Sequence, residues 1–311
     1  MQGLVTRNTG SRYDVRTCEG KVFTCTLSNA HRLKKVKTTN PVAIGDIVTL
    51  SFLNDATALI TAIAPRRNYI IRRSTNLSKE AHILAANIDR ALLLANLSHP
   101  PTTTIFIDRF LATATAYNIP VILAFNKSDR YTANERTESL RLIELYGSIG
   151  YPSRLISTYN GEGIEELSAD LVKGLTLLSG HSGVGKTSLI NYLVPDAKLP
   201  VGELSERHHR GTHTTTASLV IPYLQDAYLI DSPGIKGFAT IDIGHQEVTH
   251  YFPDLFHIAQ ECRFDNCTHR HEPGCAVLEA LHDGRIYPSR YKSYLNIFED
   301  ALHPSRYRPP Y

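Results

Sequence analysis

The segment Gly180-His-Ser-Gly-Val-Gly-Lys-Thr-Ser-Leu-Ile-Asn191 matches the phosphate-binding pattern G-x-x-x-x-G-K-S/T at every fixed position. The apolar run 175–179 before it predicts a buried strand, and residues 187–193 after it predict the opening of a helix. In this context backbone N–H groups surround phosphate oxygens at the positive end of the helix dipole. The sequence therefore predicts a binding site for a nucleoside triphosphate.

Each residue type in this loop has a chemical role. The glycines let the backbone curl, Lys186 can reach the β- and γ-phosphates, and the Thr187 hydroxyl can ligate Mg²⁺. The predicted nucleotide-binding residues of the loop are Gly180, His181, Ser182, Gly183, Val184, Gly185, Lys186, Thr187 and Ser188.

A second motif predicts that the base is guanine. The apolar strand 121–125 ends in Asn126-Lys-Ser-Asp129. A carboxylate such as Asp129 can accept hydrogen bonds from the N1–H and 2-amino groups of guanine, a donor pair that adenine lacks, while Asn126 supports the other edge of the base. We expect Asn126, Lys127 and Asp129 to bind the base, and Ser157, after a third strand, to support it from above.

The segment 229–234 places Asp231 at the end of another strand, followed by Gly234. Asp231 can hold Mg²⁺ through water, and the Gly234 N–H can reach the γ-phosphate. A hydroxyl-rich loop, 210–216, lies between the two motifs. From it Thr215, with Thr214 as the alternative, is expected to complete the Mg²⁺ shell when GTP is bound.

The order of these motifs is unusual for a Ras-like GTPase. Here the base-reading motif precedes the phosphate loop, and the switch segments come last. Strands alternating with helices predict a mainly parallel sheet covered on both faces, and such a sheet tolerates circular permutation because its strands keep their places. The segment after Asp231 then leads directly into the C-terminal region.

The N-terminal region has a different texture. Short alternating segments separated by turns favour a five-stranded OB-type barrel, although periodicity alone leaves other small barrels open. Residues 1–80 carry 13 basic and 5 acidic side chains, a net charge of +8, whereas the whole chain carries +3. A basic surface of this kind is suited to a polyanion such as RNA.

Length and composition set further limits. At 311 residues the chain has room for several domains, and it shows neither an apolar run long enough to span a membrane nor a signal peptide. With five cysteines and no disulfide pattern, we expect a cytoplasmic protein. The predicted organisation is a barrel (1–63), a basic connector (64–80), a permuted GTPase domain (81–238) and a mainly helical zinc-binding domain (239–311).

Three of the five cysteines lie close together near the C-terminus. Cys262, Cys267 and Cys275, with a histidine at 269 or 271, provide the donors of a closed tetrahedral Cys₃His zinc site. A site without an open ligand position would be structural, stabilising a small domain that has little core of its own.

Together these features resemble the RsgA family of ribosome small-subunit-dependent GTPases over almost the whole chain. The phosphate loop, Gly211-Thr-His-Thr-Thr-Thr216, Asp231-Ser-Pro-Gly-Ile235 and the segment 262–277 carry the resemblance. The family usually has serine where this chain has Thr187, and both residues supply the hydroxyl. The family pattern assigns the fourth zinc ligand to His269.

The resemblance implies GTP hydrolysis to GDP and phosphate, one Zn²⁺, Mg²⁺, binding to the small ribosomal subunit and its rRNA, and a role in late subunit maturation. Ras-like enzymes orient the attacking water with a glutamine after the switch glycine, where this chain has Ile235. We therefore expect slow intrinsic hydrolysis stimulated by the ribosome. The predicted catalytic residues are His213, which the resemblance supports, with Lys186 and Thr215. Nothing indicates more than a monomer.

Two other functions fit parts of the sequence. A GTP-regulated switch whose barrel docks a protein would lack salt-dependent rRNA binding. A small-molecule kinase would share the phosphate loop, but Asn126-Lys-Ser-Asp129 and the threonine-rich loop disfavour it.

Overall fold

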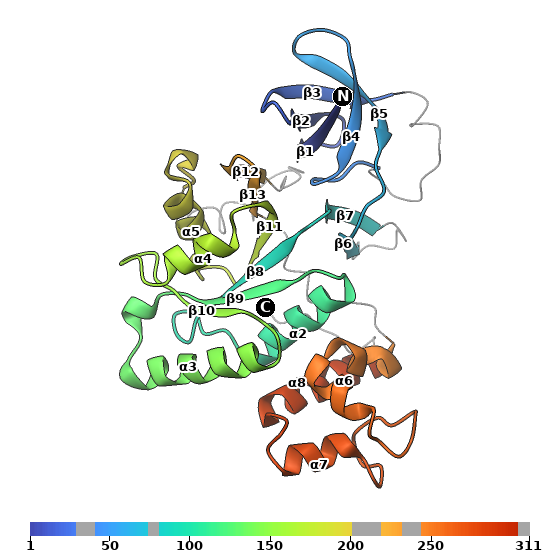
Figure 1. Ribbon diagram of the computed structural model, residues 1–311, viewed down its shortest axis with the longest axis vertical. Coiled ribbons are helices and arrows are strands. Elements are labelled where there is room, and N and C mark those ends of the chain that lie inside the picture. Colours follow the sequence, from blue (N-terminus) through green and yellow to red (C-terminus); the bar gives the residue numbers. More distant parts are fainter. Residues whose placement is uncertain (29–40, 74–80, 201–218, 232–243, 304–311) are drawn as a thin grey trace.

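The computed structural model describes residues 1–28, 41–73, 81–200, 219–231 and 244–303 (Figure 1). A barrel, a central sheet with its helices and a C-terminal helical lobe follow one another along the chain (Figure 1). In the described part of the chain, no helix combines the length and apolarity needed to cross a membrane.

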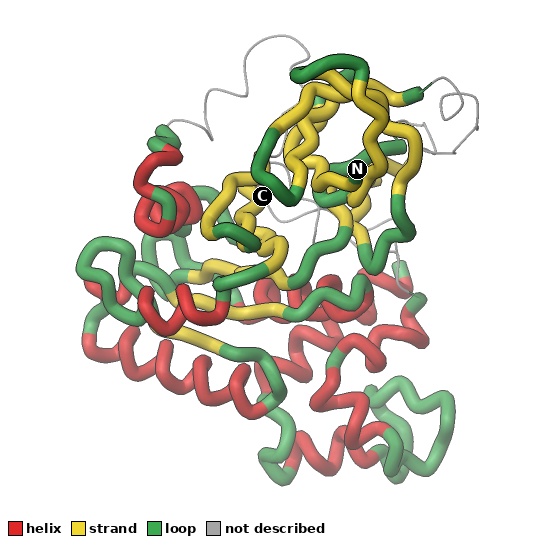
Figure 2. The backbone as a smooth tube through the Cα atoms, turned by 45° about the horizontal axis from the view of Figure 1, so that its top comes forward, coloured by secondary structure: helices red, strands yellow, loops and turns green. Residues whose placement is uncertain are grey.

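The N-terminal strands form a closed barrel, which Figure 2 shows from its open end. Its strand order is β1-β2-β3-β5-β4, and β3 and β5 pair in parallel while the other neighbours are antiparallel. Alternate side chains of each strand fill the barrel, as expected from the two-residue period of a strand. The predicted OB-type barrel is confirmed. The strands are β1 (Gln2–Asn8), β2 (Tyr13–Thr17), β3 (Val22–Leu27), β4 (Ile47–Phe52) and β5 (Thr57–Ile63).

The segment predicted as a connector contains a strand. β6 (Tyr69–Arg73) pairs with β7 (Ala81–Ala86) in a separate two-stranded sheet. Near this sheet two hydrogen bonds hold the barrel: the Ala86 N–H donates to the Ile44 carbonyl at 2.8 Å, and the Asn87 side chain donates to the Gly45 carbonyl at 2.9 Å. A Cβ atom at Gly45, whose φ is +84°, would lie 2.1 Å from the Ala86 carbonyl oxygen. The close approach therefore requires glycine.

The central sheet has the order β10-β9-β8-β11-β13-β12. Every neighbouring pair is parallel except the edge pair β12 and β13. The predicted, mainly parallel sheet is thus confirmed. Its strands are β8 (Arg90–Ala95), β9 (Val121–Phe125), β10 (Ser153–Leu155), β11 (Gly174–Ser179), β12 (Leu219–Leu224) and β13 (Ala227–Asp231).

Helices cover both faces of this sheet (Figures 1 and 2). In β8, Ala91, Leu93 and Ala95 face helices α2 and α3, whereas Leu92 and Leu94 face α4 and α5. A strand buried on both sides is apolar at consecutive positions, which explains its lack of polar alternation. The helices are α2 (Thr104–Ala116), α3 (Ala133–Ser148), α4 (Ile164–Asp170) and α5 (Lys186–Leu193), with short 3₁₀ turns η1 (Ser128–Arg130) and η2 (Pro195–Ala197).

The C-terminal lobe packs on α2 through its own small core, to which α2 contributes Ala112. The lobe and α2 are also joined by an ion pair. The Arg290 guanidinium, whose side chain is 1% exposed, donates to the fully buried Asp108 of α2 at 2.7 Å. It also donates to Asp254 at 2.7 and 3.0 Å. The lobe contains η5 (His245–Tyr251), α6 (Pro253–Ala259), α7 (Ala276–His282) and α8 (Pro288–Leu302).

Candidate nucleotide site and metal centre

The phosphate loop joins β11 to α5 in the conformation that its glycines predict. Gly180, Gly183 and Gly185 have φ values of +138°, +76° and +106°, which side-chain-bearing residues rarely adopt. A Cβ atom at Gly180 would lie 2.5 Å from the Leu94 carbonyl oxygen of the neighbouring strand. The loop therefore curls closely over the ends of β8 and β11.

Lys186 extends back across the loop. Its ammonium group donates to the carbonyl oxygens of Gly180 at 2.7 Å and His181 at 2.9 Å. Both contacts are to main-chain atoms, so they hold the positive charge over the loop. This position is suited to phosphate oxygens, for which a lysine acts as a compact charge.

The end of β9 meets the phosphate loop. The Asn126 amide donates to the Val184 carbonyl at 2.9 Å, and the Lys127 ammonium donates to the carbonyls of Gly183 at 2.6 Å and His99 at 2.9 Å. Burial, with the nearby Arg130, lowers the pKa of Lys127, an effect that Asp129 opposes. The structure thus brings the predicted base motif and phosphate motif into direct contact.

Asp129 is oriented by the loop that follows the third strand. The Ser157 hydroxyl donates to Asp129 Oδ1 at 2.5 Å and accepts from the Tyr159 N–H at 3.1 Å. Ser157 is fully buried. The Ser157 hydroxyl thus orients the carboxylate expected to read guanine, and the support of the base by this loop stays a prediction.

Asp231 ends β13, where it lies beside Leu178 of β11 in the strand register. Burial raises the pKa of Asp231, and the positive charge of Lys186 opposes that rise. The carboxylate therefore lies within the field of the phosphate-loop lysine, at the same edge of the sheet as Thr187. The other predicted switch residues, namely His213, Thr214, Thr215 and Gly234, lie outside the described residues.

Buried Asn126 Oδ1 has no hydrogen-bond partner among the described atoms. Such an atom costs free energy unless a ligand or water satisfies it. Its place between the base motif and the phosphate loop fits a bound nucleotide.

Two supporting side chains were not predicted. The Tyr131 hydroxyl donates to the Asn126 carbonyl at 2.8 Å and accepts from the Leu97 N–H at 3.1 Å. Burial raises the pKa of Tyr131 to about 12, so this hydroxyl stays protonated at neutral pH. The ring centroid of Phe106, on α2, lies 3.9 Å from the ring centroid of His181. Neither residue belongs to a recognisable motif, since the bond between Tyr131 and Leu97 spans 34 positions and the contact between Phe106 and His181 depends on how α2 packs.

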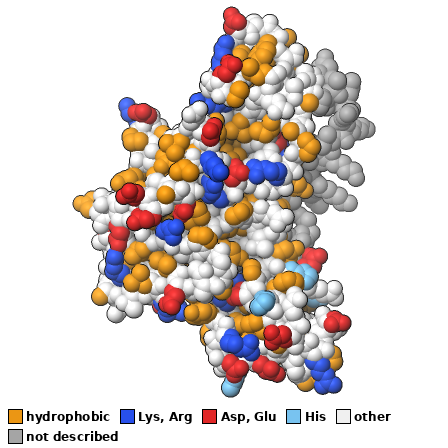
Figure 3. Space-filling view, in the orientation of Figure 1, with side chains coloured by type: hydrophobic (Ala, Val, Ile, Leu, Met, Phe, Trp, Pro, Cys, Tyr) orange, Lys and Arg blue, Asp and Glu red, His pale blue; other side chains and the backbone are white. Residues whose placement is uncertain are grey.

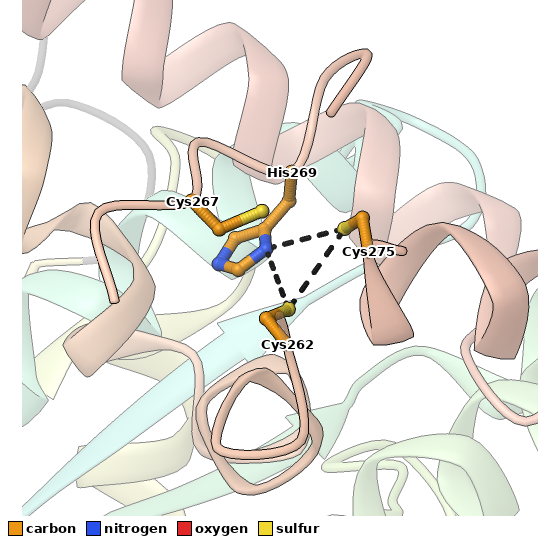
Figure 4. Close-up of side chains that lie close together, drawn as sticks. All are labelled: Cys262, Cys267, His269 and Cys275. Atoms are coloured by element: carbon orange, nitrogen blue, oxygen red, sulfur yellow. Dashed lines mark hydrogen bonds between the residues drawn. The ribbon is translucent and has the colours of Figure 1, made fainter. Parts of the chain in front are cut away.

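Cys262, Cys267, His269 and Cys275 converge in the C-terminal lobe, with the imidazole Nδ1 turned toward the thiols (Figure 4). Their ligand atoms all lie within 4.8 Å of one another. Nδ1 is 3.6 Å from Cys262 Sγ and 3.5 Å from Cys275 Sγ, and these two sulfur atoms are 4.0 Å apart. Tetrahedral zinc, with bonds of roughly 2.0 to 2.3 Å, needs ligand atoms about 3.5 to 3.8 Å apart. The cluster fits a zinc ion.

Outer contacts hold this cluster in shape. The Tyr291 hydroxyl donates to the His269 carbonyl at 2.7 Å, and the Tyr294 hydroxyl donates to the Thr268 carbonyl at 2.9 Å. The Glu272 carboxylate accepts from the N–H groups of Thr268, Arg270 and His271. Burial opposes its ionisation, but these bonds and one from the Thr268 hydroxyl hold the pKa of Glu272 well below its usual range. Such outer contacts fix ligand orientation.

Comparison with known proteins agrees with this architecture. Residues 63–241 match the family model described as RsgA GTPase. A Porphyromonas gingivalis protein named small ribosomal subunit biogenesis GTPase RsgA is 54% identical over 316 residues, covering 100% of both chains. A Bacteroides thetaiotaomicron relative, named small ribosomal subunit biogenesis GTPase RsgA 2, is 50% identical over 311 residues, again covering 100% of both chains.

Two crystal structures share the fold. YjeQ from Thermotoga maritima superposes with a TM-score of 0.81 at 28% identity, covering 97% of this chain and 98% of its own. YloQ, described as a circularly permuted GTPase, gives a TM-score of 0.77 at 26% identity, covering 100% of this chain and 96% of its own. The fold is thus shared with a solved structure that is described as circularly permuted.

Proposed function

The chain belongs to the RsgA GTPase family, and from that premise we propose that it hydrolyses GTP on the small ribosomal subunit and assists late subunit maturation. The observation that carries the proposal is the hydrogen bond from the Asn126 amide to the Val184 carbonyl, which joins the proposed guanine-binding motif to the phosphate loop. The relatives' names supply the ribosomal partner. We further propose that it acts as a cytoplasmic monomer.

Each part of the site has a proposed role. Asp129, oriented by Ser157, accepts the N1–H and 2-amino protons of guanine, and Asn126 and Lys127 support the base. The loop N–H groups and Lys186 bind the phosphates. The remaining phosphate contacts are assigned to His181, Ser182, Thr187, Ser188 and Gly234.

Thr187, Asp231 and Thr215 are the proposed residues for Mg²⁺, which, when bound, would neutralise the charge of the β- and γ-phosphates. Ile235 cannot orient the attacking water, so His213 is proposed to do so. Slow intrinsic hydrolysis follows from the missing glutamine, with the ribosome expected to order the switch segments.

The barrel is proposed to contact rRNA mainly through phosphates, since residues 1–80 carry a net charge of +8. Basic side chains gather where the barrel meets the central sheet, interleaved with acidic ones (Figure 3). The Arg67 side chain is 63% exposed although it pairs with Asp89. Cys262, Cys267, His269 and Cys275 are proposed to hold one structural Zn²⁺, which would stabilise the second ribosome-contacting domain.

The test is phosphate release by the purified protein with small subunits, large subunits or neither. We expect strong stimulation by small subunits only, weakening as salt rises because phosphate contacts release counterions. A Lys186→Ala variant in the same reactions corrects for contaminating GTPases. Equal rates with and without small subunits, while GDP still binds, would place the partner elsewhere.

A further inference from the structure

Glu162 lies outside the motifs assigned to the nucleotide, yet it contacts both loops that form the base site. Its carboxylate accepts a hydrogen bond from the Ser128 hydroxyl at 2.6 Å. Arg136 of α3 pairs with the same carboxylate. Ser128 immediately precedes Asp129 and is buried, with 4% of its surface exposed.

The main chain of Glu162 holds the other loop. Its carbonyl accepts from the Ser157 N–H at 2.9 Å, and the Ser157 carbonyl accepts from the Gly161 N–H at 2.9 Å. Gly163 then takes a φ of +66°, where a Cβ atom would lie 2.1 Å from the Leu155 carbonyl oxygen. The turn is therefore tightly constrained, and the position of Glu162 within it is determined by the fold.

These contacts of Glu162 meet around the carboxylate of Asp129. Ser128 is the chain neighbour of Asp129, and Ser157 is its hydrogen-bond partner at 2.5 Å. Glu162 thus bonds with its side chain to the residue before Asp129, and with its backbone to the residue that orients Asp129. The Ser128 N–H also donates to the Ile156 carbonyl at 3.2 Å, a backbone bond that does not involve Glu162.

We propose that Glu162 is a positioning residue for guanine recognition, holding the loop of Asp129 against the loop of Ser157 so that the Asp129 carboxylate meets the base edge. The proposal rests on the base-reading role assigned to Asp129 above. Glu162 itself need not touch the nucleotide.

The two side-chain contacts of Glu162 differ in strength. The Arg136 and Glu162 side chains are 47% and 30% exposed, so their ion pair is largely screened by solvent. The Ser128 hydroxyl is buried and bonds to an ionised acceptor, which makes it the stronger contact. Hydrogen bonds from Arg136 and Ser128 lower the pKa of Glu162, which keeps the acceptor charged at neutral pH.

The test compares the dissociation constants of GDP and inosine diphosphate, which lacks the 2-amino group. Their ratio, IDP over GDP, measures how well Asp129 reads the base. Glu162→Ala should lower this ratio about tenfold, as expected for loss of one hydrogen bond to a charged group. Glu162→Gln keeps an uncharged acceptor for Ser128 and should lower the ratio less than Glu162→Ala does. Ser128→Ala should resemble Glu162→Ala.

Glu138→Ala is the matched control, because Glu138 is an exposed α3 glutamate paired with Arg141. Thermal unfolding of each variant verifies folding. If Glu162→Ala and Ser128→Ala lower the ratio less than threefold, or weaken GDP and IDP equally, the positioning role is wrong. If wild-type protein itself does not prefer GDP to IDP, the assumed role of Asp129 fails instead.

Discussion

The Asn126 side-chain amide donates to the Val184 carbonyl at 2.9 Å, although the two residues lie 58 positions apart in the chain. Asn126 follows the strand that leads to the base motif, and Val184 lies inside the phosphate loop. The bond ties the two ends of the nucleotide site together. A change on either side should therefore affect binding of the whole nucleotide.

Gly185→Ala tests this contact. A Cβ atom at Gly185 would lie 2.2 Å from Asn126 Nδ2, and the φ of +106° disfavours any side chain. The substitution should displace Asn126 and strain the loop, weakening GDP binding by about tenfold or more through loss of at least one buried hydrogen bond. Fluorescent-GDP titration measures the change.

Gly147→Ala is its control. Gly147 lies in α3 with an ordinary φ, and a Cβ atom there would have no neighbour within 4 Å. Alanine should leave GDP affinity unchanged and raise the free energy of unfolding by up to about 1 kcal/mol. Equal GDP affinities in Gly185→Ala and Gly147→Ala would contradict the loop geometry.

Arg290→Ala should separate the C-terminal lobe from α2. Arg290 is 1% exposed and pairs with the fully buried Asp108, so its removal leaves an uncompensated carboxylate. Breaking such a pair costs about 3 to 5 kcal/mol in free energy of unfolding. Urea denaturation followed by circular dichroism provides the measurement.

Arg141→Ala is the matched change at the surface. The side chains of Arg141 and its partner Glu138 are 47% and 46% exposed. Such exposed ion pairs contribute about 1 kcal/mol or less to the free energy of unfolding. If Arg290→Ala were no more destabilising than Arg141→Ala, the buried pair would not hold the lobe in place.

Zinc removal should unfold the C-terminal lobe before the rest of the protein. The purified chain should contain about one zinc ion, and Cys275→Ser should abolish stoichiometric binding because the closed site needs all four ligands. Elemental analysis gives the metal content, and proteolysis of chelator-treated protein locates the unfolded region. Cys18→Ser, at an exposed cysteine in the barrel, should retain zinc.

Acid should weaken the contribution of Glu162 to stability. Hydrogen bonds from Arg136 and Ser128 place the pKa of Glu162 below its ordinary value of about 4.3. A carboxylate with a depressed folded-state pKa stabilises the protein above the unfolded-state pKa, and loses this effect as pH falls through the folded-state pKa. The difference in urea midpoint between wild type and Glu162→Ala should therefore be full near neutral pH and shrink below about pH 4. Glu144→Ala, at an exposed glutamate of α3, serves as control, and a difference that grew with acidity would contradict the assignment.

Local patterns were sufficient for much of the architecture. The phosphate loop, the alternation of strands with helices and the zinc ligand set each depend on residues close in sequence, whose backbone geometry or spacing follows from their chemistry. Short alternating segments predict the barrel, but they do not predict β6, because its partner β7 lies beyond an intervening segment. The domain limits and the roles of individual site residues stay predictions.

Other relationships depend on the packed fold. Spacing alone does not indicate that Tyr131 bonds to Leu97, that Ser157 orients Asp129, or that Arg290 reaches Asp108 across 182 positions. Each joins segments whose distance is set by strand register and helix packing, and buried polar groups then take whichever partner the fold supplies. The sequence alone thus determined which chemical groups are candidates for the site. The tertiary structure determined how the described ones support one another, because side-chain contacts between distant segments exist only after the sheet and its helices have assembled.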